Sequence, residues 1–574
     1  MPTAATEFLK ALEEAGVSYI FANFGTDHPP ILESLAEAHA NGQPVPQVIT
    51  CPHEMVALSA AHGYAQATGR AQAVLVHVDV GTQSLGGAVH NTAKGRVPVL
   101  LFAGISPITQ EGELRGSRNE WVHWVQNVLD QRGIVRGYVK YENEIRTGRN
   151  IKQIVHRALQ IAQSDPQGPV YLTAAREVLE EDVPSAAVHD PKLWHPVAPG
   201  AIEPSAAALI AEELIASRRP LVISSYLGRN PAAVGELITL CHTLGIGAWT
   251  SVPNYLNFPA DDPLYLGNQV NAPAINPLLA ETDVVLVLDC DVPWIPTATK
   301  PNGTAKIYHI DVDPLKEHMP LWYFPMQDSF RADAATALQQ INAYIARAKA
   351  NGKIDEMLVE ERRAHYSAIH AARSKELAAR EAPHPDAITP EYLTARVREH
   401  LPPDALVLNE GITSHNIIAD HIRANRPGSF FSGGGSIGWN TGAAVGIKLA
   451  HPDKTVVVLT GDGSYMASIP SAAHWIAGRY KTPFVQVVYN NRGWKAPKVS
   501  TLAVHPDGFV SKSNEIGVAF DPPPDYSGIA AAAGGAFASI VRQPGELDAA
   551  LSEAFRVVRE ERRCAVLDVW LPGF

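Results

Sequence analysis

Short apolar segments alternate with helix-like segments along the chain, and this alternation restricts the possible fold more than any other feature of the sequence. Strands that alternate with helices are typical of a parallel sheet covered by helices on both faces. The first series has strand-like segments at residues 18–21, 47–49, 73–78 and 98–102 and helix-like segments at residues 8–15, 30–40, 53–68 and 86–96. The chain is therefore expected to begin with an α/β domain.

The alternation is interrupted twice. A proline-rich stretch at residues 189–205 precedes a second series, and a charged helix at residues 355–380, followed by prolines, precedes a third. A chain of 574 residues is also too long for one core. We expect three doubly wound parallel-sheet α/β domains, with limits at residues 1–188, 200–350 and 391–574 and a helical connector at residues 351–390.

Composition excludes several classes of function. The chain has 47 Lys and Arg against 59 Asp and Glu, a net charge of −12, and no basic block, which argues against a nucleic-acid partner. Its four cysteines are far apart and form no C-x-x-C pair, so we expect neither a zinc ribbon nor a disulfide framework. No signal-peptide pattern begins the chain, and no apolar stretch reaches the roughly 20 residues of a membrane span. We expect a cytoplasmic protein.

The clearest chemical pattern follows two successive strand-like segments of the third unit. Asp462 lies in a Gly-Asp-Gly turn after the first, and Asn491 lies in an Asn-Asn pair after the second. Because neighbouring parallel strands end at one edge of a sheet, these two oxygen ligands should converge. Mg²⁺ prefers such ligands, and Gly461 and Gly463 would let a diphosphate approach the backbone. A lone Gly-Asp-Gly is usually an ordinary turn, but the distant Asn-Asn favours a metal–diphosphate site.

This run resembles the Gly-Asp-Gly…Asn-Asn motif of the thiamine-diphosphate-dependent enzymes of the acetolactate synthase, benzoylformate decarboxylase and pyruvate decarboxylase family. The resemblance implies thiamine diphosphate and Mg²⁺ as cofactors. Asp462, Asn491 and the Gly493 carbonyl would be the metal ligands, and Ser464 would contact the diphosphate. The chain departs from the family in a helix about two residues longer between Ser464 and Pro483, and in NNRGW where Tyr-Gly often follows. The second departure changes the expected shape of the pocket.

Two upstream loops, NEGITSHN and SGGGSIGWNTGAAVG, resemble the cofactor-binding loops of the same family. By this resemblance the Gly435 carbonyl would bind the aminopyrimidine, and Ile437 would wedge the cofactor into a bent conformation. The alternative for Ile437 is an ordinary core residue. Thr413 and Ser414 resemble phosphate-side contacts, and His415 is either a pocket residue or a neighbour of a helix cap.

Glu54 falls in the first turn of a helix-like segment. A glutamate there is most often a favourable partner of the helix dipole. However, the pattern H-E-x-x-x-x-x-x-A-x-G-Y-A, which ends at Gly63, Tyr64 and Ala65, resembles the cofactor-activating glutamate motif of the family. The resemblance implies that Glu54 binds the pyrimidine ring nitrogen and helps to form the cofactor ylid.

Residues 74–104 resemble benzoylformate decarboxylase over their whole length. His77 occupies the position of its active-site histidine, Thr26 that of its serine, and Asn91 a structural position. Acetolactate-type synthases usually have Ser-Gly-Pro-Gly in place of the His-Val-Asp-Val of this chain. The alternative for His77 is a structural histidine at the end of a strand. Gln126 resembles the glutamine that faces the cofactor in the synthases, so the chain combines features of both branches.

The candidate substrate contacts are His28, His415, Trp494 and Lys495. Trp494 and Lys495 follow the predicted metal loop, and they either line the pocket or form only its rim. The middle unit lacks a GxGxxG dinucleotide pattern, so we expect a scaffold there and no flavin.

The resemblance thus implies a 2-oxo acid decarboxylase or carboligase, similar to benzoylformate decarboxylase, that acts through a cofactor ylid and an enamine. The alternatives are an acetolactate synthase-type transferase that joins two 2-oxo acids, a nicotinamide or flavin oxidoreductase, and a non-catalytic subunit. In the family, the Glu54 element and the metal site of one active site come from different subunits. We therefore expect a homodimer or homotetramer with shared sites, a small carbonyl substrate, and neither nucleic acid nor membrane as a partner.

Overall fold

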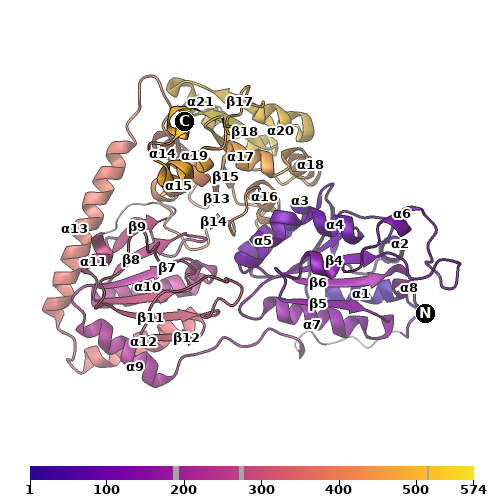
Figure 1. Ribbon diagram of the computed structural model, residues 1–574, viewed down its shortest axis with the longest axis horizontal. Helices are drawn as coiled ribbons and strands as arrows, with labels where there is room; N and C mark the ends of the chain where they lie inside the picture. Colours follow the sequence, from indigo (N-terminus) through magenta and orange to yellow (C-terminus); the bar gives the residue numbers. More distant parts are fainter. Residues whose placement is uncertain (185–189, 191–192, 270–276, 514–515, 574) are drawn as a thin grey trace. The chain divides into compact units, whose positions relative to one another are not determined.

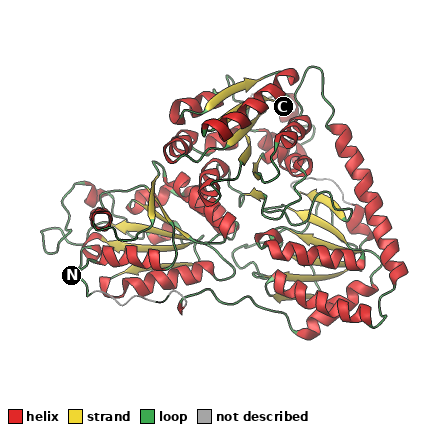
Figure 2. Ribbon diagram, turned by 180° about the vertical axis from the view of Figure 1, so that it is seen from behind, coloured by secondary structure: helices red, strands yellow, loops and turns green. Residues whose placement is uncertain are grey.

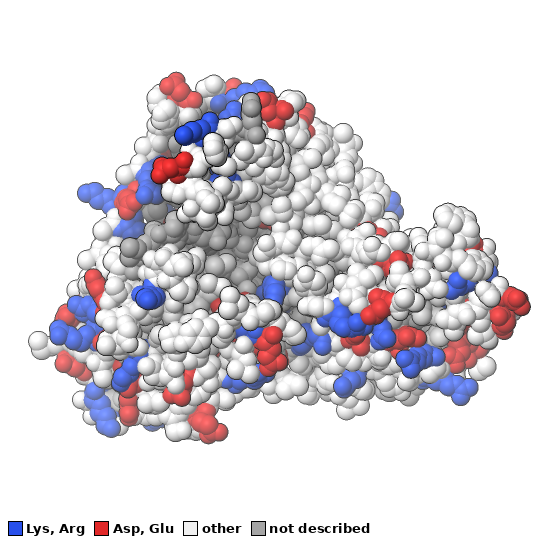
Figure 3. Space-filling view, viewed as in Figure 1, with Lys and Arg blue, Asp and Glu red and all other residues white. Residues whose placement is uncertain are grey.

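The computed structural model describes residues 1–184, 190, 193–269, 277–513 and 516–573 (Figure 1). The predicted domain limit at residue 188 lies outside these residues, as does part of the predicted linker at residues 189–205. Among the described helices, none is both long and apolar enough to cross a membrane. On the face drawn in Figure 3, basic and acidic side chains lie intermixed, as the absence of a basic block in the sequence predicts.

The first sheet has the strand order β2-β1-β3-β4-β6-β5. Its strands are β1 (Tyr19–Ala22), β2 (Gln47–Thr50), β3 (Gln72–Val76), β4 (Val99–Ile105), β5 (Tyr141–Ile145) and β6 (Val170–Ala175). Its helices are α1 (Ala4–Glu14), α2 (Pro29–Ala40), α3 (Glu54–Thr68), α4 (Val78–Ser84), α5 (Gly86–Lys94), α6 (Val122–Val125), α7 (Ile151–Gln163) and α8 (Arg176–Leu179). Both β2 and β3 pair in parallel with β1, on opposite sides of it. The order of the strands therefore reverses at β1, and the connections that follow β1 and β3 begin at neighbouring strand ends.

The second sheet has the order β12-β11-β10-β7-β8-β9. Its strands are β7 (Pro220–Ser224), β8 (Gly247–Ser251), β9 (Tyr265–Gln269), β10 (Val284–Leu288), β11 (Lys306–Asp311) and β12 (Asp328–Arg331). The helices of this part are α9 (Pro204–Ala216), α10 (Pro231–Leu244), α11 (Pro277–Glu281), α12 (Ala334–Ala350) and the long α13 (Glu356–Arg380). The charged helix predicted at residues 355–380 is confirmed as α13, whose first turn is capped by the Asp355 side chain.

The third sheet has the order β14-β13-β15-β16-β18-β17. Its strands are β13 (Leu406–Glu410), β14 (Phe430–Ser432), β15 (Val456–Gly461), β16 (Val485–Asn490), β17 (Phe537–Val541) and β18 (Ala565–Trp570). Its helices are α14 (Pro390–His400), α15 (His415–Ile422), α16 (Asn440–Ala450), α17 (Asp462–Ala467), α18 (Pro470–Tyr480), α19 (Lys495–Val504), α20 (Tyr526–Gly534) and α21 (Leu547–Arg556). The prediction of three parallel-sheet α/β domains is confirmed, and Figure 2 shows helices against each sheet.

The described chain divides into two compact units. One comprises Met1–Val197, Gly433–Ile540 and Ser552–Asp568, and the other comprises Ala198–Ser432, Val541–Leu551 and Val569–Phe574. Within the first unit, α3 and α16 pack at very short range: a Cβ atom on Gly446 would lie 1.8 Å from the carbonyl oxygen of Ala60. Glycine is therefore required at this helix–helix crossing.

Two local predictions were wrong. The strand predicted at residues 73–78 ends at Val76, and His77 is instead the N-cap residue of α4. The helix predicted between Ser464 and Pro483 is two helices, because Ile469 has a positive φ of 53° and Pro470 begins α18. A proline lacks the N–H that would continue the preceding helix, so the chain starts a new one.

Candidate active site

Asp462 and Asn491 leave neighbouring strands. Parallel pairing of β15 with β16 sets Gly461 opposite Tyr489, so both residues follow the same edge of the sheet. The Asp462 side chain is buried and accepts the backbone N–H of Gly463 at 2.8 Å and that of Gly493 at 2.9 Å. The Gly-Asp-Gly segment predicted as a turn is the start of α17, and one carboxylate joins it to the segment after β16.

The oxygen atoms of this cluster are suited to a cation. Burial raises the pKa of Asp462 to about 6, although the N–H groups of Gly463 and Gly493 oppose that shift. The buried Oδ1 of Asn491 accepts no hydrogen bond from the described residues. A carboxylate in a poorly solvated position and an amide oxygen without a donor are groups that a hard cation would satisfy. No cluster of three or more His, Cys, Asp or Glu residues suited to a metal occurs in the described chain, so this mixed set is the candidate metal centre.

The loop after β16 depends on close backbone approach. Gly493 has a φ of +148°, and a Cβ atom there would lie 2.2 Å from the carbonyl oxygen of Val518. Trp494 lies against the Gly-Asp-Gly turn, because a Cβ atom on Gly463 would lie 2.3 Å from its ring, and that ring packs edge-on against Phe520 at 5.0 Å. Trp494 therefore forms a wall beside the turn.

Lys495, the first residue of α19, is half-buried. Its backbone N–H donates to the Gly493 carbonyl at 3.0 Å, which leaves that oxygen a second lone pair.

Glu54 is the first residue of α3 and is buried. Its Oε1 accepts a hydrogen bond from Nδ2 of Asn23 at 2.9 Å. A Cβ atom on Gly81 would lie 3.2 Å from the same oxygen, so α4 also approaches this carboxylate. The prediction that Glu54 lies in the first turn is confirmed, and its position is fixed by a residue that follows β1.

The glycine segment after β14 is held by α5. The buried Asn91 side chain donates to the Ser436 carbonyl at 2.8 Å and accepts the Ser436 N–H at 2.7 Å. On either side of Ser436, Gly435 is exposed with a φ of +111°, and Ile437 is half-buried. Ile437 is thus not fully buried.

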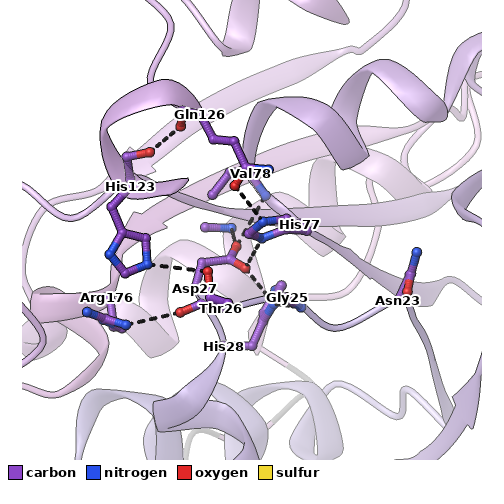
Figure 4. Close-up of polar contacts among 12 residues, drawn as sticks. Asn23, Gly25, Thr26, Asp27, His28, His77, Val78, His123, Gln126 and Arg176 are labelled. Carbon is purple, nitrogen blue, oxygen red and sulfur yellow. Dashed lines mark hydrogen bonds and ion pairs between the residues drawn. The ribbon is translucent and has the colours of Figure 1, made fainter. Parts of the chain in front are cut away.

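His77 lies between two hydrogen-bonding partners (Figure 4). Its Nδ1 is 2.6 Å from Oδ1 of Asp27, and its Nε2 is 2.9 Å from Oε1 of Gln126. A Cβ atom on Gly25 would lie 2.1 Å from Nδ1 of His77, so the ring lies directly on the backbone of the β1–α2 connection. Asp27 and His77 come from the connections after β1 and β3, where the strand order predicts a crevice, and Gln126 comes from the connection after β4.

Charge within this cluster favours an ion pair. Burial raises the pKa of Asp27, but the neighbouring His28 and His77 rings outweigh burial and hold it well below its usual range. Burial lowers the pKa of His77, but the contacts with Asp27 and Gln126 outweigh burial and raise it above its ordinary value. His28 is fully buried with Nδ1 2.9 Å from Asp27, so this candidate substrate contact lies behind the carboxylate.

Thr26 is held from the other side (Figure 4). Its hydroxyl lies 3.3 Å from Nε2 of His123, and its carbonyl accepts a hydrogen bond from the Arg176 guanidinium at 3.1 Å. The backbone carbonyl of Gln126 accepts a hydrogen bond from Ser106. Thr26, His77 and Gln126, which are far apart in the sequence, are therefore brought together.

Thr413, Ser414 and His415 belong to the other compact unit. Thr413 is exposed, and Ser414 is the N-cap residue of α15. His415 is the first residue of α15 and is buried; burial lowers its pKa to about 4, and its Nε2 has no partner among the described residues. Its side chain does not cap the helix.

Three models of one protein family match the chain. They describe the N-terminal TPP binding domain of thiamine pyrophosphate enzymes at residues 2–134, the central domain at residues 207–341 and the C-terminal TPP binding domain at residues 411–569. The chain belongs to the thiamine pyrophosphate enzyme family.

Relatives of this thiamine pyrophosphate enzyme include decarboxylases and synthases. Benzoylformate decarboxylase of Pseudomonas aeruginosa is 25% identical over 500 residues, which cover 86% of each chain. The large subunit of acetolactate synthase isozyme 3 of Escherichia coli is 24% identical over 601 residues, which cover 100% of this chain and 95% of the synthase. The fold is similar to that of the thiamine diphosphate-dependent 4-hydroxybenzoylformate decarboxylase of Rhodococcus jostii RHA1, with a TM-score of 0.79 at 19% identity over 100% of this chain and 99% of that one.

Sequence reasoning missed several residues of this thiamine pyrophosphate enzyme. Asn23 and Asp27 lie in the connection that also carries Thr26, and a polar cluster directly after β1 was the available signal. His123 and Arg176 had no comparable signal, because their contacts with Thr26 span 97 and 150 residues.

Proposed function

We propose that this thiamine pyrophosphate enzyme is a Mg²⁺-dependent 2-oxo acid decarboxylase that can also act as a carboligase. The observation that carries the proposal is His77, held between Asp27 and Gln126 beside Thr26. Its environment favours a positively charged imidazole, and a cationic N–H donor is suited to the carboxylate of a 2-oxo acid. The relative named benzoylformate decarboxylase supports the same class of reaction.

The metal centre and the turn around it would hold the phosphate end of the cofactor. Mg²⁺ would be held by Asp462, Asn491 and the Gly493 carbonyl, the oxygen ligands that such a cation prefers. The residues beside the diphosphate would be Gly461, Gly463 and Ser464. When bound, thiamine diphosphate supplies the electron sink for the negative charge that loss of CO₂ leaves behind.

The other end of the cofactor would meet α3 and the glycine segment. Glu54 would bind the pyrimidine ring nitrogen, with Asn23 fixing the orientation of its carboxylate. The Gly435 carbonyl would accept a hydrogen bond from the amino group of the same ring, and Ile437 would hold the bent conformation. Trp494 would bound the pocket beside the metal loop.

A synthase-type reaction is the second candidate, and one observation favours it. Gln126, whose side chain resembles the cofactor-facing glutamine of the synthases, contacts Nε2 of His77. A side-chain amide next to the imidazole would give a second carbonyl compound a hydrogen-bond donor. The chain would then join two 2-oxo acids in place of releasing an aldehyde.

The test is product analysis with the full-length protein. Purified protein would be incubated with thiamine diphosphate, Mg²⁺ and a panel of aromatic and aliphatic 2-oxo acids, and CO₂, aldehydes and ligation products would be measured. Release of CO₂ with an equal amount of aldehyde supports the decarboxylase. Release of about two CO₂ per ligated product identifies a carboligase that joins two decarboxylated units, and release of about one CO₂ identifies a synthase that joins two 2-oxo acids. Reactions without cofactor, and with Glu54→Gln, are the controls. Absence of CO₂ from every 2-oxo acid contradicts the proposal.

A further inference from the structure

Asp27 is a buried carboxylate that makes four polar contacts. Its Oδ1 lies 2.6 Å from Nδ1 of His77 and 2.9 Å from Nδ1 of His28. Its Oδ2 accepts the N–H of Gly104 at 2.9 Å and that of Val78 at 3.3 Å. These contacts tie the connection after β1 to the start of α4 and to β4, so the carboxylate is fixed before any ligand binds.

The two histidines contact Asp27 differently. Nδ1 of His28 is shared, because it lies 2.9 Å from Asp27 and also 3.0 Å from the backbone nitrogen of Gly25, whose N–H points at it. Nδ1 of His77 has no competing contact of this kind and lies closer. The short contact is therefore assigned as a charge-assisted hydrogen bond from His77 to Asp27.

The other nitrogen of His77 also faces an acceptor. Its Nε2 lies 2.9 Å from Oε1 of Gln126. A neutral imidazole has one N–H and satisfies one acceptor, whereas the imidazolium has two and satisfies both. The geometry on the two sides of the ring thus matches the protonated form.

We propose that Asp27 is a positioning residue, which fixes His77 as an imidazolium whose Nε2–H exchanges its hydrogen bond to Gln126 for one to the carboxylate of a 2-oxo acid. The inference rests on the proposed function. After CO₂ leaves, the Nε2 proton passes to the carbon that lost it. His77 is then neutral, with its Nδ1–H still on Asp27, and solvent restores the Nε2 proton.

Other charged groups also lie near His77. Asp79 on α4 adds negative charge near His77, whereas His123 on α6 and His77 repel each other when both are charged, and Arg176 on α8 acts on His123. His28, on the far side of Asp27, is fully buried. The negative group in direct contact is Asp27, and it therefore determines the balance at the ring.

The first test measures His77 without any reaction of the enzyme. Diethyl pyrocarbonate acylates the neutral imidazole, and mass spectrometry of the peptide that contains His77 follows its reactivity between about pH 5 and 9, the range in which imidazoles titrate. In the wild-type protein we expect half-maximal reactivity above about pH 6.5, the ordinary pKa of histidine. In Asp27→Asn the half-point should fall by about one unit or more, because an opposite charge in contact is removed.

A matched control is Glu177→Gln. Glu177 is also buried and accepts hydrogen bonds from Thr109, but it does not contact His77. This variant should leave the half-point unchanged even if it lowers stability. An unchanged half-point in Asp27→Asn overturns the proposal. If Asp27→Asn does not fold, a wild-type half-point at or below about pH 6.5 overturns it as well.

The second test is the pH dependence of turnover. If His77 must be protonated, kcat falls as pH rises through its pKa, and Asp27→Asn should move this falling limb to lower pH and reduce kcat about tenfold near pH 8. A merely structural role would reduce kcat equally at all pH values and leave the limb in place, which overturns the proposal. If the wild-type protein converts no 2-oxo acid, the proposed function fails, and the acylation experiment still decides the role of Asp27.

Discussion

At the scale of single residues, the candidate metal centre consists of two side chains whose oxygen atoms lack full hydrogen bonding. Asp462 receives only backbone N–H groups in a buried position, and Oδ1 of Asn491 receives no donor within the described chain. Burying such groups costs free energy unless a cation or a proton compensates them. This cost is the reason to regard the pair as a binding site and not as part of a stable core.

We expect Asp462→Asn to reduce Mg²⁺-dependent affinity for thiamine diphosphate by about hundredfold or more, because a charged ligand becomes a neutral one of the same shape. Isothermal titration of the cofactor at saturating Mg²⁺ measures the effect. Asp453→Asn makes the same change at an exposed position of the same domain and should bind normally. Equal affinity in the Asp462 variant and this control would contradict the metal assignment.

Glu54→Gln should fold and bind cofactor but exchange the thiazolium C2 proton at least about a hundredfold more slowly, because the amide cannot act as the carboxylate partner of the pyrimidine nitrogen. Deuterium exchange followed by NMR measures the rate. Glu37→Gln, an exposed change on α2, should exchange as the wild type does. A wild-type exchange rate in Glu54→Gln would exclude the assigned role.

At the scale of elements, the alternation of strands and helices was enough to predict three parallel sheets, since it is a property of local sequence. The ends of elements were harder. His77 precedes α4 as its N-cap residue, and Asp27, 51 residues before Val78, accepts the N–H of Val78, the first residue of that helix. The sequence predicted His77, Thr26 and Gln126 as site residues only through a resemblance. It did not predict Asp27, whose partners become neighbours only after folding.

One pairing of elements can be tested directly. Asn91 on α5 makes two hydrogen bonds with the backbone of Ser436, so Asn91→Ala should cost about 1–3 kcal/mol of stability and weaken cofactor binding by releasing the glycine segment. Thermal unfolding and cofactor titration measure the two effects. Asn41→Ala, at the exposed end of α2, is the control. Unchanged cofactor affinity in Asn91→Ala would show that the segment is held in place by other contacts.

At the scale of the whole molecule, the two ends of the proposed cofactor site come from different domains of the sequence. Within the first compact unit, Met55 next to Glu54 approaches the glycine segment: a Cβ atom on Gly438 would lie 2.9 Å from its Cε. A site completed within one chain is therefore the alternative to the shared site expected from the resemblance. The two arrangements differ in what a mixture of inactive chains can do.

We propose a homodimer, or a homotetramer built from it, in which each site takes Glu54 from one subunit and Asp462 from the other. Glu54→Gln and Asp462→Asn proteins, each inactive alone, would be dissociated, mixed and reassembled, and turnover would be measured against an equally treated wild type. With shared sites, a mixed dimer has one site with both defects and one with neither, so random mixing should restore about a quarter of the wild-type activity. With sites inside single chains, every site keeps one defect and no activity returns. Mass photometry of the reassembled samples confirms that mixed oligomers formed, so that a lack of activity in such samples contradicts the shared site.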